Sequence, residues 1–231
     1  MTGIRRDLPL PILLAWVIVM AACSGDRSAP PSTATTAQAR NPAAVAASVN
    51  LTLEDLPAEF VAVPGDGDDD ALGGCAADFQ DDVLGQAEAP RFERRSRSGL
   101  ASVASSTAMF ADDARGAAFM AFLKEESTLE CLRQMFAERL IESSPSATVE
   151  AVTLSPAASS LDLGDDTLVL EGTMTVSEPR LEAPFDLIYS LVVVRTGEVA
   201  TLLYFTGLGE PFPGELIPEL TATVAERQSR T

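Results

Sequence analysis

The sequence contains no histidine, and it has only 16 lysines and arginines against 34 aspartates and glutamates. Without histidine the chain has no imidazole general base, no histidine-containing catalytic triad and no histidine-ligated metal site. The formal net charge of −18 excludes nucleic-acid binding through phosphate neutralisation and argues against electrostatic docking on anionic headgroups. The 46% of hydrophobic residues is nevertheless typical of a globular protein.

A long hydrophobic run is also missing. The apolar stretch at residues 8–20 is 13 residues long. A helix needs about 20 apolar residues to cross a bilayer. Two arginines precede this stretch and the small pair Ala21–Ala22 follows it, which is typical of a signal peptide with a small-residue cleavage site. We therefore predict that residues 1–22 are a signal peptide.

Cys23 follows the small pair directly, and the segment Met20-Ala21-Ala22-Cys23 resembles a bacterial lipobox. The resemblance implies that a diacylglyceryl group is attached to the Cys23 sulfur before cleavage. Two or three acyl chains, at about 0.8 kcal/mol per buried CH₂, then hold the protein stably on a membrane. We expect a lipoprotein on the extracytoplasmic face of the cell membrane. The alternatives are an ordinary secretory signal and an uncleaved signal anchor.

The chain has three cysteines, and an odd thiol in an exported protein needs an explanation. Acylation of Cys23 would explain the odd number of thiols. Cys75 and Cys131 then remain as a pair, which we predict to form a disulfide outside the cytoplasm. In the chain-entropy model, closing a loop of about 56 residues stabilises the fold by about 4 kcal/mol. The alternative is two buried free thiols.

Residues 23–48 are rich in serine, threonine, alanine and proline and lack the large apolar side chains of a core. Such a composition is typical of disordered segments, so we predict a flexible tether. No later shift in composition divides the chain. Residues 49–231 are therefore expected to form one domain.

The pattern of apolar residues in this domain predicts both strands and helices. Strands are expected at 50–53, 91–97, 101–110, 149–154, 168–176, 185–194 and 199–205, and helices at 75–84, from 114, from a capping box at 127–130, and from 216. Residues 185–194 are apolar on both faces, which favours a central strand covered on both sides. The order predicts an α+β fold, a single antiparallel β-sheet with helices packed mainly on one face.

The acidic residues offer weak candidates for a site. Asp66, Asp68 and Asp70 have the alternate spacing of a calcium loop, but the turn glycine and the final glutamate of such a loop are replaced by Ala71 and Ala77. We interpret this segment as a solvated acidic loop and expect neither a metal nor a cofactor.

Two pairs of adjacent carboxylates, Asp112–Asp113 and Asp165–Asp166, are the candidates for acid–base catalysis. Adjacent side chains usually point apart, and the first pair suits the start of a helix. Lys124 lies beside two glutamates, Glu125 and Glu126, and a surface ion pair is expected there rather than a Ser–Lys nucleophile. We therefore expect no catalytic residue and no enzyme.

One basic stretch stands out in this acidic chain, formed by Arg91, Arg94, Arg95 and Arg97. It either meets an anionic partner or neutralises acidic loops nearby, and the sequence leaves both interpretations open. The aromatic residues fall on predicted helix and strand faces. We expect them in the core, with a subset lining a cleft.

Several features together carry a family resemblance: the lipobox and tether, Leu53-Glu54-Asp55-Leu56-Pro57, the Cys75 and Cys131 pair, and Leu163-Gly164-Asp165 before a strand-rich segment. The chain resembles small lipoproteins and sensor-like extracellular domains of actinobacterial envelopes, including PsbP-like lipoproteins and the external domain of PknH-type kinases. The resemblance implies an α+β sheet with a cleft and a binding role. We expect an apolar or amphiphilic ligand or an envelope partner. The alternatives are a carboxylate-dependent envelope hydrolase and a structural or assembly lipoprotein.

Overall fold

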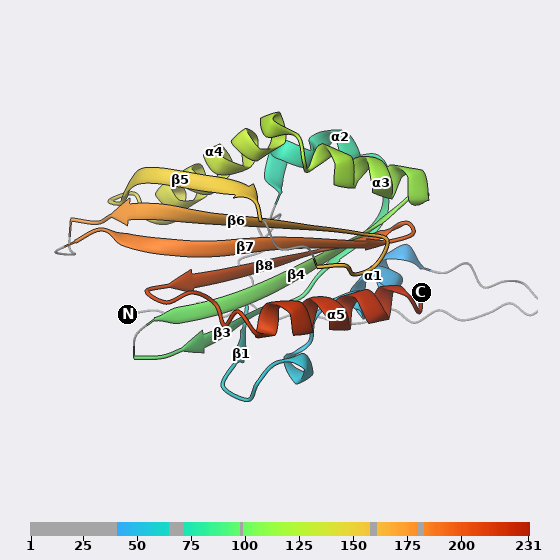
Figure 1. Cartoon of the computed structure of the whole chain (residues 1–231), viewed down its shortest axis with the longest axis horizontal. Coiled ribbons are helices and arrows are strands. Elements are labelled where there is room, and N and C mark those ends of the chain that lie inside the picture. The colour runs from blue at the N-terminus through green and yellow to red at the C-terminus, as the bar shows by residue number, and fades with distance from the viewer. Residues whose placement is uncertain (1–40, 65–71, 98, 158–160, 180–182) are drawn as a thin grey trace, which may run out of the picture. The chain divides into compact units, whose positions relative to one another are not determined.

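One antiparallel sheet organises the computed structural model, which describes residues 41–64, 72–97, 99–157, 161–179 and 183–231 (Figure 1). In these residues eight strands pair in the order β1-β3-β4-β8-β7-β6-β5, and β2 also pairs with β4. The strands are β1 (Val61–Val63), β2 (Val83–Glu88), β3 (Arg91–Arg95), β4 (Leu100–Phe110), β5 (Thr148–Pro156), β6 (Asp166–Ser177), β7 (Phe185–Thr196) and β8 (Val199–Leu208). The α+β class and the single antiparallel sheet are confirmed.

The helices lie on both faces of this sheet (Figure 1). They are α1 (Pro42–Val49), α2 (Ala77–Gln80), α3 (Asp113–Phe122), α4 (Glu126–Ser143) and α5 (Leu216–Gln228), with two short 3-10 helices, η1 (Leu53–Asp55) and η2 (Gly73–Ala76). One core joins the sheet to α3 and α4, and a second core joins its other face to α1 and α5. The expected covering of one face is formed by α2, α3 and α4, and α1 and α5 cover the other face as well. No described helix is both long and apolar enough to span a bilayer.

Strand β7 shows why two cores form. Leu191 and Val193 belong to the core under α3 and α4, whereas Val192 and Val194 belong to the core under α5. Successive residues of a strand point to opposite faces, so a run of apolar residues must be covered twice. The predicted central strand is thus confirmed. A tight turn at Gly197, with φ of 58°, joins β7 to β8, the two strands expected at 185–194 and 199–205.

Strand β4 is long enough to pair with two strands along one edge. Its first half pairs with β3, as in Arg94 opposite Ala101, and its second half pairs with β2, as in Glu88 opposite Ser106. The other edge of β4 pairs with β8 along nearly its whole length. β2 and β3 therefore follow one another along β4. The sequence did not predict β2, because its small and polar residues show no apolar alternation.

The ordered domain begins earlier than residue 49. Helix α1 occupies Pro42–Val49, and its Ala46 and Val49 are fully buried. The Asn41 side chain accepts a hydrogen bond from the Ala43 backbone at 3.2 Å and caps the helix. The small side chains of α1 let its backbone approach Gly85 of β2 so closely that a Cβ there would collide with it. The segment predicted as the end of a tether is therefore part of the fold. The predicted signal peptide, Cys23 and most of the tether lie outside the described residues.

Two helix starts test the capping predictions. Asp112 caps α3, because its carboxylate accepts a hydrogen bond from the Arg115 backbone at 2.8 Å. The next helix, α4, begins at Glu126, and its N-cap residue Glu125 makes no side-chain capping bond. The predicted capping box at residues 127–130 was therefore wrong, because these residues already lie inside α4. Residues 50–52 are not a strand but lead into η1.

Candidate functional site

A pocket of about 490 Å³ lies between the sheet and the segment that carries η2 and α2. Its floor is formed by residues of β2, β4 and β8, namely Val83, Gly85, Gln86, Ser106, Ala108, Phe110, Ala200 and Leu202. Its roof is formed by residues 72–80, which we call the roof segment, through Leu72, Gly73, Ala76, Phe79 and Gln80. Phe119 of α3 completes the lining.

The floor is hollow because its central side chains are small. Ser106 and Ala108 are alternate residues of β4 and so point to the same face of the sheet. Ala200 of β8 lies directly opposite Ala108. Larger side chains at these positions would fill the space under the roof segment. The sequence carried this signal in the small residues of 101–110, but it did not show what would lie above them.

Three phenylalanines form one end of the pocket. The Phe79 and Phe119 rings meet edge to face with centroids 5.5 Å apart, and the Phe110 and Phe119 centroids are 5.1 Å apart. Phe110 and Phe119 were among the aromatic residues expected in the core, and both also line the pocket. Phe79 was not singled out in the sequence, because it lies in a one-turn helix without a clear apolar stripe.

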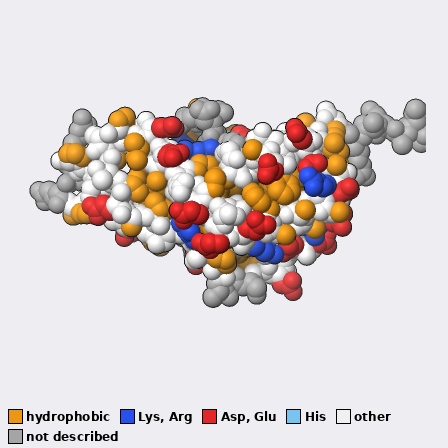
Figure 2. All heavy atoms as spheres, turned by 90° about the horizontal axis from the view of Figure 1, so that it is seen from above, with side chains coloured by type: hydrophobic (Ala, Val, Ile, Leu, Met, Phe, Trp, Pro, Cys, Tyr) orange, Lys and Arg blue, Asp and Glu red, His pale blue; other side chains and the backbone are white. Residues whose placement is uncertain are grey.

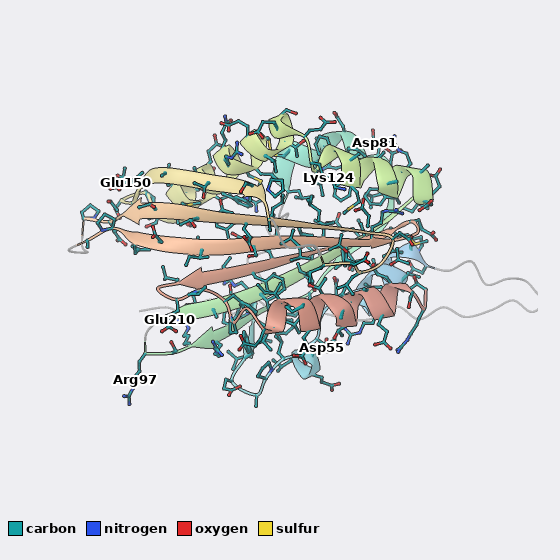
Figure 3. The ribbon with its side chains drawn as sticks, in the orientation of Figure 1. Asp55, Asp81, Arg97, Lys124, Glu150 and Glu210 are labelled. Carbon is teal, nitrogen blue, oxygen red and sulfur yellow. A yellow bond between two sulfur atoms is a disulfide. The ribbon has the colours of Figure 1, made fainter. Side chains whose placement is uncertain are left out.

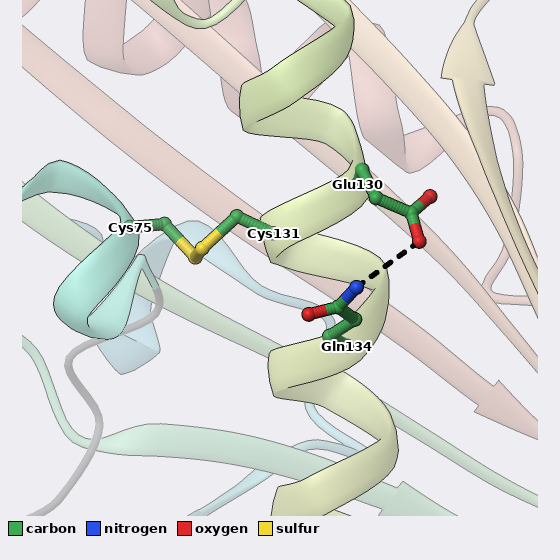
Figure 4. Close-up of a disulfide and its surroundings, with 4 residues drawn as sticks. All are labelled: Cys75, Glu130, Cys131 and Gln134. Carbon is green, nitrogen blue, oxygen red and sulfur yellow. Dashed lines mark hydrogen bonds between the residues drawn. A yellow bond between two sulfur atoms is a disulfide. The ribbon is translucent and has the colours of Figure 1, made fainter.

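The disulfide holds the roof segment to α4 (Figure 4). Cys75 of η2 and Cys131 of α4 are bonded with their Cα atoms 5.8 Å apart and a sequence separation of 56, which is the pairing expected from the sequence. Beside this bond, Gln134 donates a hydrogen bond to Glu130 at 3.2 Å (Figure 4). Hydrogen bonds from Arg133 and then from Gln134 lower the pKa of Glu130. The covalent tie thus fixes the pocket's roof.

The pocket itself is electrically neutral. Among the described residues that line it none is charged, and the polar ones are Gln80, Gln86 and Ser106. The guanidinium carbon of Arg115 lies 5.6 Å from the centroid of the Phe79 ring, and the Arg115 charge is paired with Asp82. On the outer surface of the molecule, seen from above Figure 1, Figure 2 shows scattered hydrophobic side chains and more acidic than basic groups. Such a site suits an apolar or uncharged ligand.

In the structure, three of the four carboxylates of the acidic pairs, Asp113, Asp165 and Asp166, form ion pairs. Asp113 and Asp165 both approach the buried guanidinium of Arg195, and Asp165 also accepts a hydrogen bond from the Gly197 backbone at 2.8 Å. Both carboxylates are more than half exposed, and they share one cation. This arrangement ties the start of α3 to the β7–β8 turn.

Lys124 pairs differently from the expectation. It lies between α3 and α4 rather than within a helix, and its Nζ is 3.3 Å from Asp166 of β6 rather than beside Glu125 or Glu126 (Figure 3). The predicted surface ion pair therefore exists with another partner. Lys124 therefore contacts a strand that is distant in sequence.

The basic stretch neutralises an acid within its own strand. Glu93 of β3 is 5% exposed, and Arg91 and Arg95 approach it at 3.2 and 3.1 Å. Residues two apart share a face of a strand, so the three side chains meet on one side. Arg94 on the other face lies over the Phe60 ring at 5.6 Å. These contacts favour charge balance over a binding patch.

The described residues contain no group of three or more acidic or cysteine side chains placed to hold a metal ion. Asp66, Asp68 and Asp70, the predicted acidic loop, lie outside the described residues.

The comparisons with known proteins place the chain in no family. No protein-family model and no curated protein matches it. Among solved structures, it is similar to the extracellular domain of PknH from Mycobacterium tuberculosis, with 8% sequence identity and a TM-score of 0.36 over 82% of this chain and 97% of that one. A likeness of this degree says nothing about function.

Proposed function

We propose that this chain is a lipid-anchored extracytoplasmic lipoprotein whose domain binds an apolar or amphiphilic small molecule beneath the roof segment. The pocket of about 490 Å³ carries this proposal. Ligand sites commonly have volumes of about 300–1,000 Å³ and mostly apolar walls with a few polar groups. The neutral lining, with three phenylalanines at one end, fits that description.

The role is binding and not catalysis. Histidine is absent from the chain, and the pocket's polar groups are two amides and one hydroxyl. The carboxylates that could replace histidine are engaged with Arg195 and Lys124. A general acid would need an apolar surrounding that raises its pKa, whereas these carboxylates are exposed and paired.

The cellular address is inferred from two features. The segment ending at Cys23 resembles a lipobox, and the disulfide between Cys75 and Cys131 is of the kind that persists in oxidising compartments. Growth on labelled palmitate tests the anchor. We expect label on the wild-type chain and none on Cys23→Ala, and equal labelling of both would contradict the anchor.

Fluorescence of N-phenyl-1-naphthylamine, an uncharged dye that brightens in apolar surroundings, tests the pocket. We expect the purified protein to bind the dye and the variant Ala108→Phe, whose new ring fills the floor, to lose that binding. Ala151→Phe, at an exposed position of β5, is the matched control and should bind like the wild type. Equal binding by Ala108→Phe, or no binding by the wild type, would contradict the proposal.

A further inference from the structure

The floor of the pocket is flat where three small side chains meet. Ser106 and Ala108 follow one another on the pocket face of β4, and Ala200 of β8 lies directly opposite Ala108. Alternate residues of a strand are about 7 Å apart, and directly opposite residues have their Cβ atoms about 4.5–5.5 Å apart. Alanine ends at its Cβ, and serine extends one atom further. We call these three residues the flat patch, which is about as large as the face of a two-ring aromatic molecule.

Larger side chains border the flat patch. Gln86 of β2 lies opposite Ala108, and Leu202 of β8 lies opposite Ser106. Phe110 is the next residue on the same face of β4, and the centroid of its ring is 5.1 Å from that of Phe119. Aromatic rings pack favourably edge to face or offset against a further ring. A ligand ring lying on the flat patch would therefore meet aromatic rings at one of its edges.

Two contacts hold the roof segment in place above the floor. The disulfide ties Cys75 to α4, and a Cβ at Gly73 would come within 2.5 Å of the Met135 sulfur, so the backbone of the roof segment lies directly on α4. The roof cannot rise to admit a thicker ligand without losing these contacts, and such a clash is a source of specificity. An aromatic ring system is one atom thick, whereas a saturated ring system is puckered. The pocket should therefore select ligands by thickness.

One polar group of the flat patch has no protein partner. The half-buried hydroxyl of Ser106 makes no hydrogen bond to any of the described residues. By contrast Ser105, on the other face of β4, accepts a hydrogen bond from the Leu51 backbone at 3.0 Å. A ligand that covers Ser106 without bonding to it would remove its hydroxyl from water at a cost in free energy. A hydroxyl both donates and accepts, so a hydroxyl or carbonyl oxygen of the ligand would satisfy it.

We propose that the pocket binds a planar fused-ring aromatic compound that carries a hydroxyl or carbonyl oxygen, with the ring face over Ala108 and Ala200 and the oxygen at Ser106. This inference rests on the proposed function and names the ligand class of the same site. A flexible acyl chain would gain nothing from a flat floor, and it would not place an oxygen at Ser106 while its chain lies on the patch.

Displacement of N-phenyl-1-naphthylamine from the purified protein tests the ligand class. The competitors are 2-naphthol, its saturated counterpart decahydro-2-naphthol and the open-chain 1-decanol, which all have the same number of carbons and one hydroxyl. 2-Naphthol should displace the dye at a concentration about tenfold lower than either of the others. Equal or stronger displacement by decahydro-2-naphthol or by 1-decanol would overturn the planar ligand. Dye binding without displacement by 2-naphthol would overturn this inference alone, whereas failure of the dye to bind would overturn the proposed function.

Ser106→Ala tests the placement of the ligand oxygen. The variant should bind 2-naphthol about fivefold more weakly, because it loses one hydrogen bond, and should bind naphthalene, which has no oxygen, within about twofold of the wild type. Retained naphthalene binding shows that the variant is folded. Ser155→Ala, at an exposed position of β5, is the matched control and should change neither affinity. Unchanged 2-naphthol affinity in Ser106→Ala would overturn the placement of the oxygen.

Ala108→Val tests the flat floor, because its two methyl groups rise above the patch. By isothermal titration calorimetry it should bind 2-naphthol about tenfold more weakly and 1-decanol, which can bend around the methyl groups, within about threefold. A circular dichroism spectrum like that of the wild type shows that the variant is folded, and Ala151→Val is the matched control. Unchanged 2-naphthol affinity, or equal weakening of both compounds in the folded variant, would overturn the flat floor.

Discussion

The side-chain amide of Gln228 donates a hydrogen bond to the hydroxyl of Thr201 at 2.9 Å, and both residues are almost completely buried. The Thr201 hydroxyl meets that of Thr107 at 2.9 Å, and Thr107 donates to the Asn50 side chain at 2.7 Å. A chain of polar contacts thus crosses from α5 through β8 and β4 to the segment after α1. It joins the two ends of the described domain.

Gln228→Ala is expected to lower the free energy of unfolding by about 1–3 kcal/mol, because the substitution removes the donor to the buried Thr201 hydroxyl and to the Val194 carbonyl. Urea denaturation followed by circular dichroism measures this loss. Arg230→Ala removes only an exposed ion pair with Glu226 and should change stability by less than about 1 kcal/mol. Equal midpoints for the two variants would show that the buried contacts contribute nothing.

The pairing of Asp55 with Arg227 makes part of the stability depend on pH. Burial acts to raise the pKa of Asp55, but hydrogen bonds from Arg227 and Thr52 outweigh it and hold the pKa below its usual 3.8. A carboxyl with a lowered pKa stabilises the fold fully above its unfolded pKa and loses this contribution as the pH falls through its folded pKa.

Asp55→Asn should therefore destabilise the protein by a constant amount at pH values from about 5 to 7 and by less and less below about pH 4. Urea titrations across this range measure the difference. Glu54→Gln, at an exposed position in the same short helix, controls for the loss of one negative charge. A difference between Asp55→Asn and wild type that stays constant into acid would contradict the pairing.

The disulfide is expected to support both the fold and the pocket. Replacing Cys75 and Cys131 together with serine should cost about 4 kcal/mol of stability in the chain-entropy model. It should also weaken dye binding, because η2 then loses its covalent tie to α4. Cys23→Ser is the matched control and should alter neither property. Unfolding midpoints that do not respond to a reducing agent would contradict this prediction.

Gly172 of β6 lies opposite Tyr189 of β7, whose ring covers it. A Cβ at Gly172 would collide with that ring and with the Thr153 carbonyl, which accepts the Tyr189 hydroxyl at 2.6 Å. Gly172→Ala should therefore destabilise the protein by about 1–3 kcal/mol in thermal or urea unfolding. Gly214→Ala, where a Cβ meets nothing within 4 Å, should leave stability within about 0.5 kcal/mol. Equal stability of the two variants would show that the Tyr189 ring and the Thr153 carbonyl leave room for a Cβ at Gly172.

Local patterns predicted those elements whose cause is local. The apolar alternation of β6 and the two-faced run of β7 each depend on neighbours in sequence, and so does the Asp112 cap. Helix α1 and strand β2 escaped prediction because their small residues have no periodic signal. Tertiary contacts hold both elements in place, because the backbone of α1 packs closely on Gly85 and β2 pairs with β4. The signal peptide and the acylation of Cys23 stay predictions.

The sequence by itself determined the class of fold, the absence of histidine chemistry and the candidate partner of each domain cysteine. Only the tertiary structure decided that helices cover both faces, that Lys124 pairs with Asp166, and that a pocket remains above Ala108 and Ala200. The physical reason is that a cavity is space left between elements distant in the chain. Its volume depends on how the disulfide-held roof segment sits above the sheet, and no run of neighbouring residues encodes that placement.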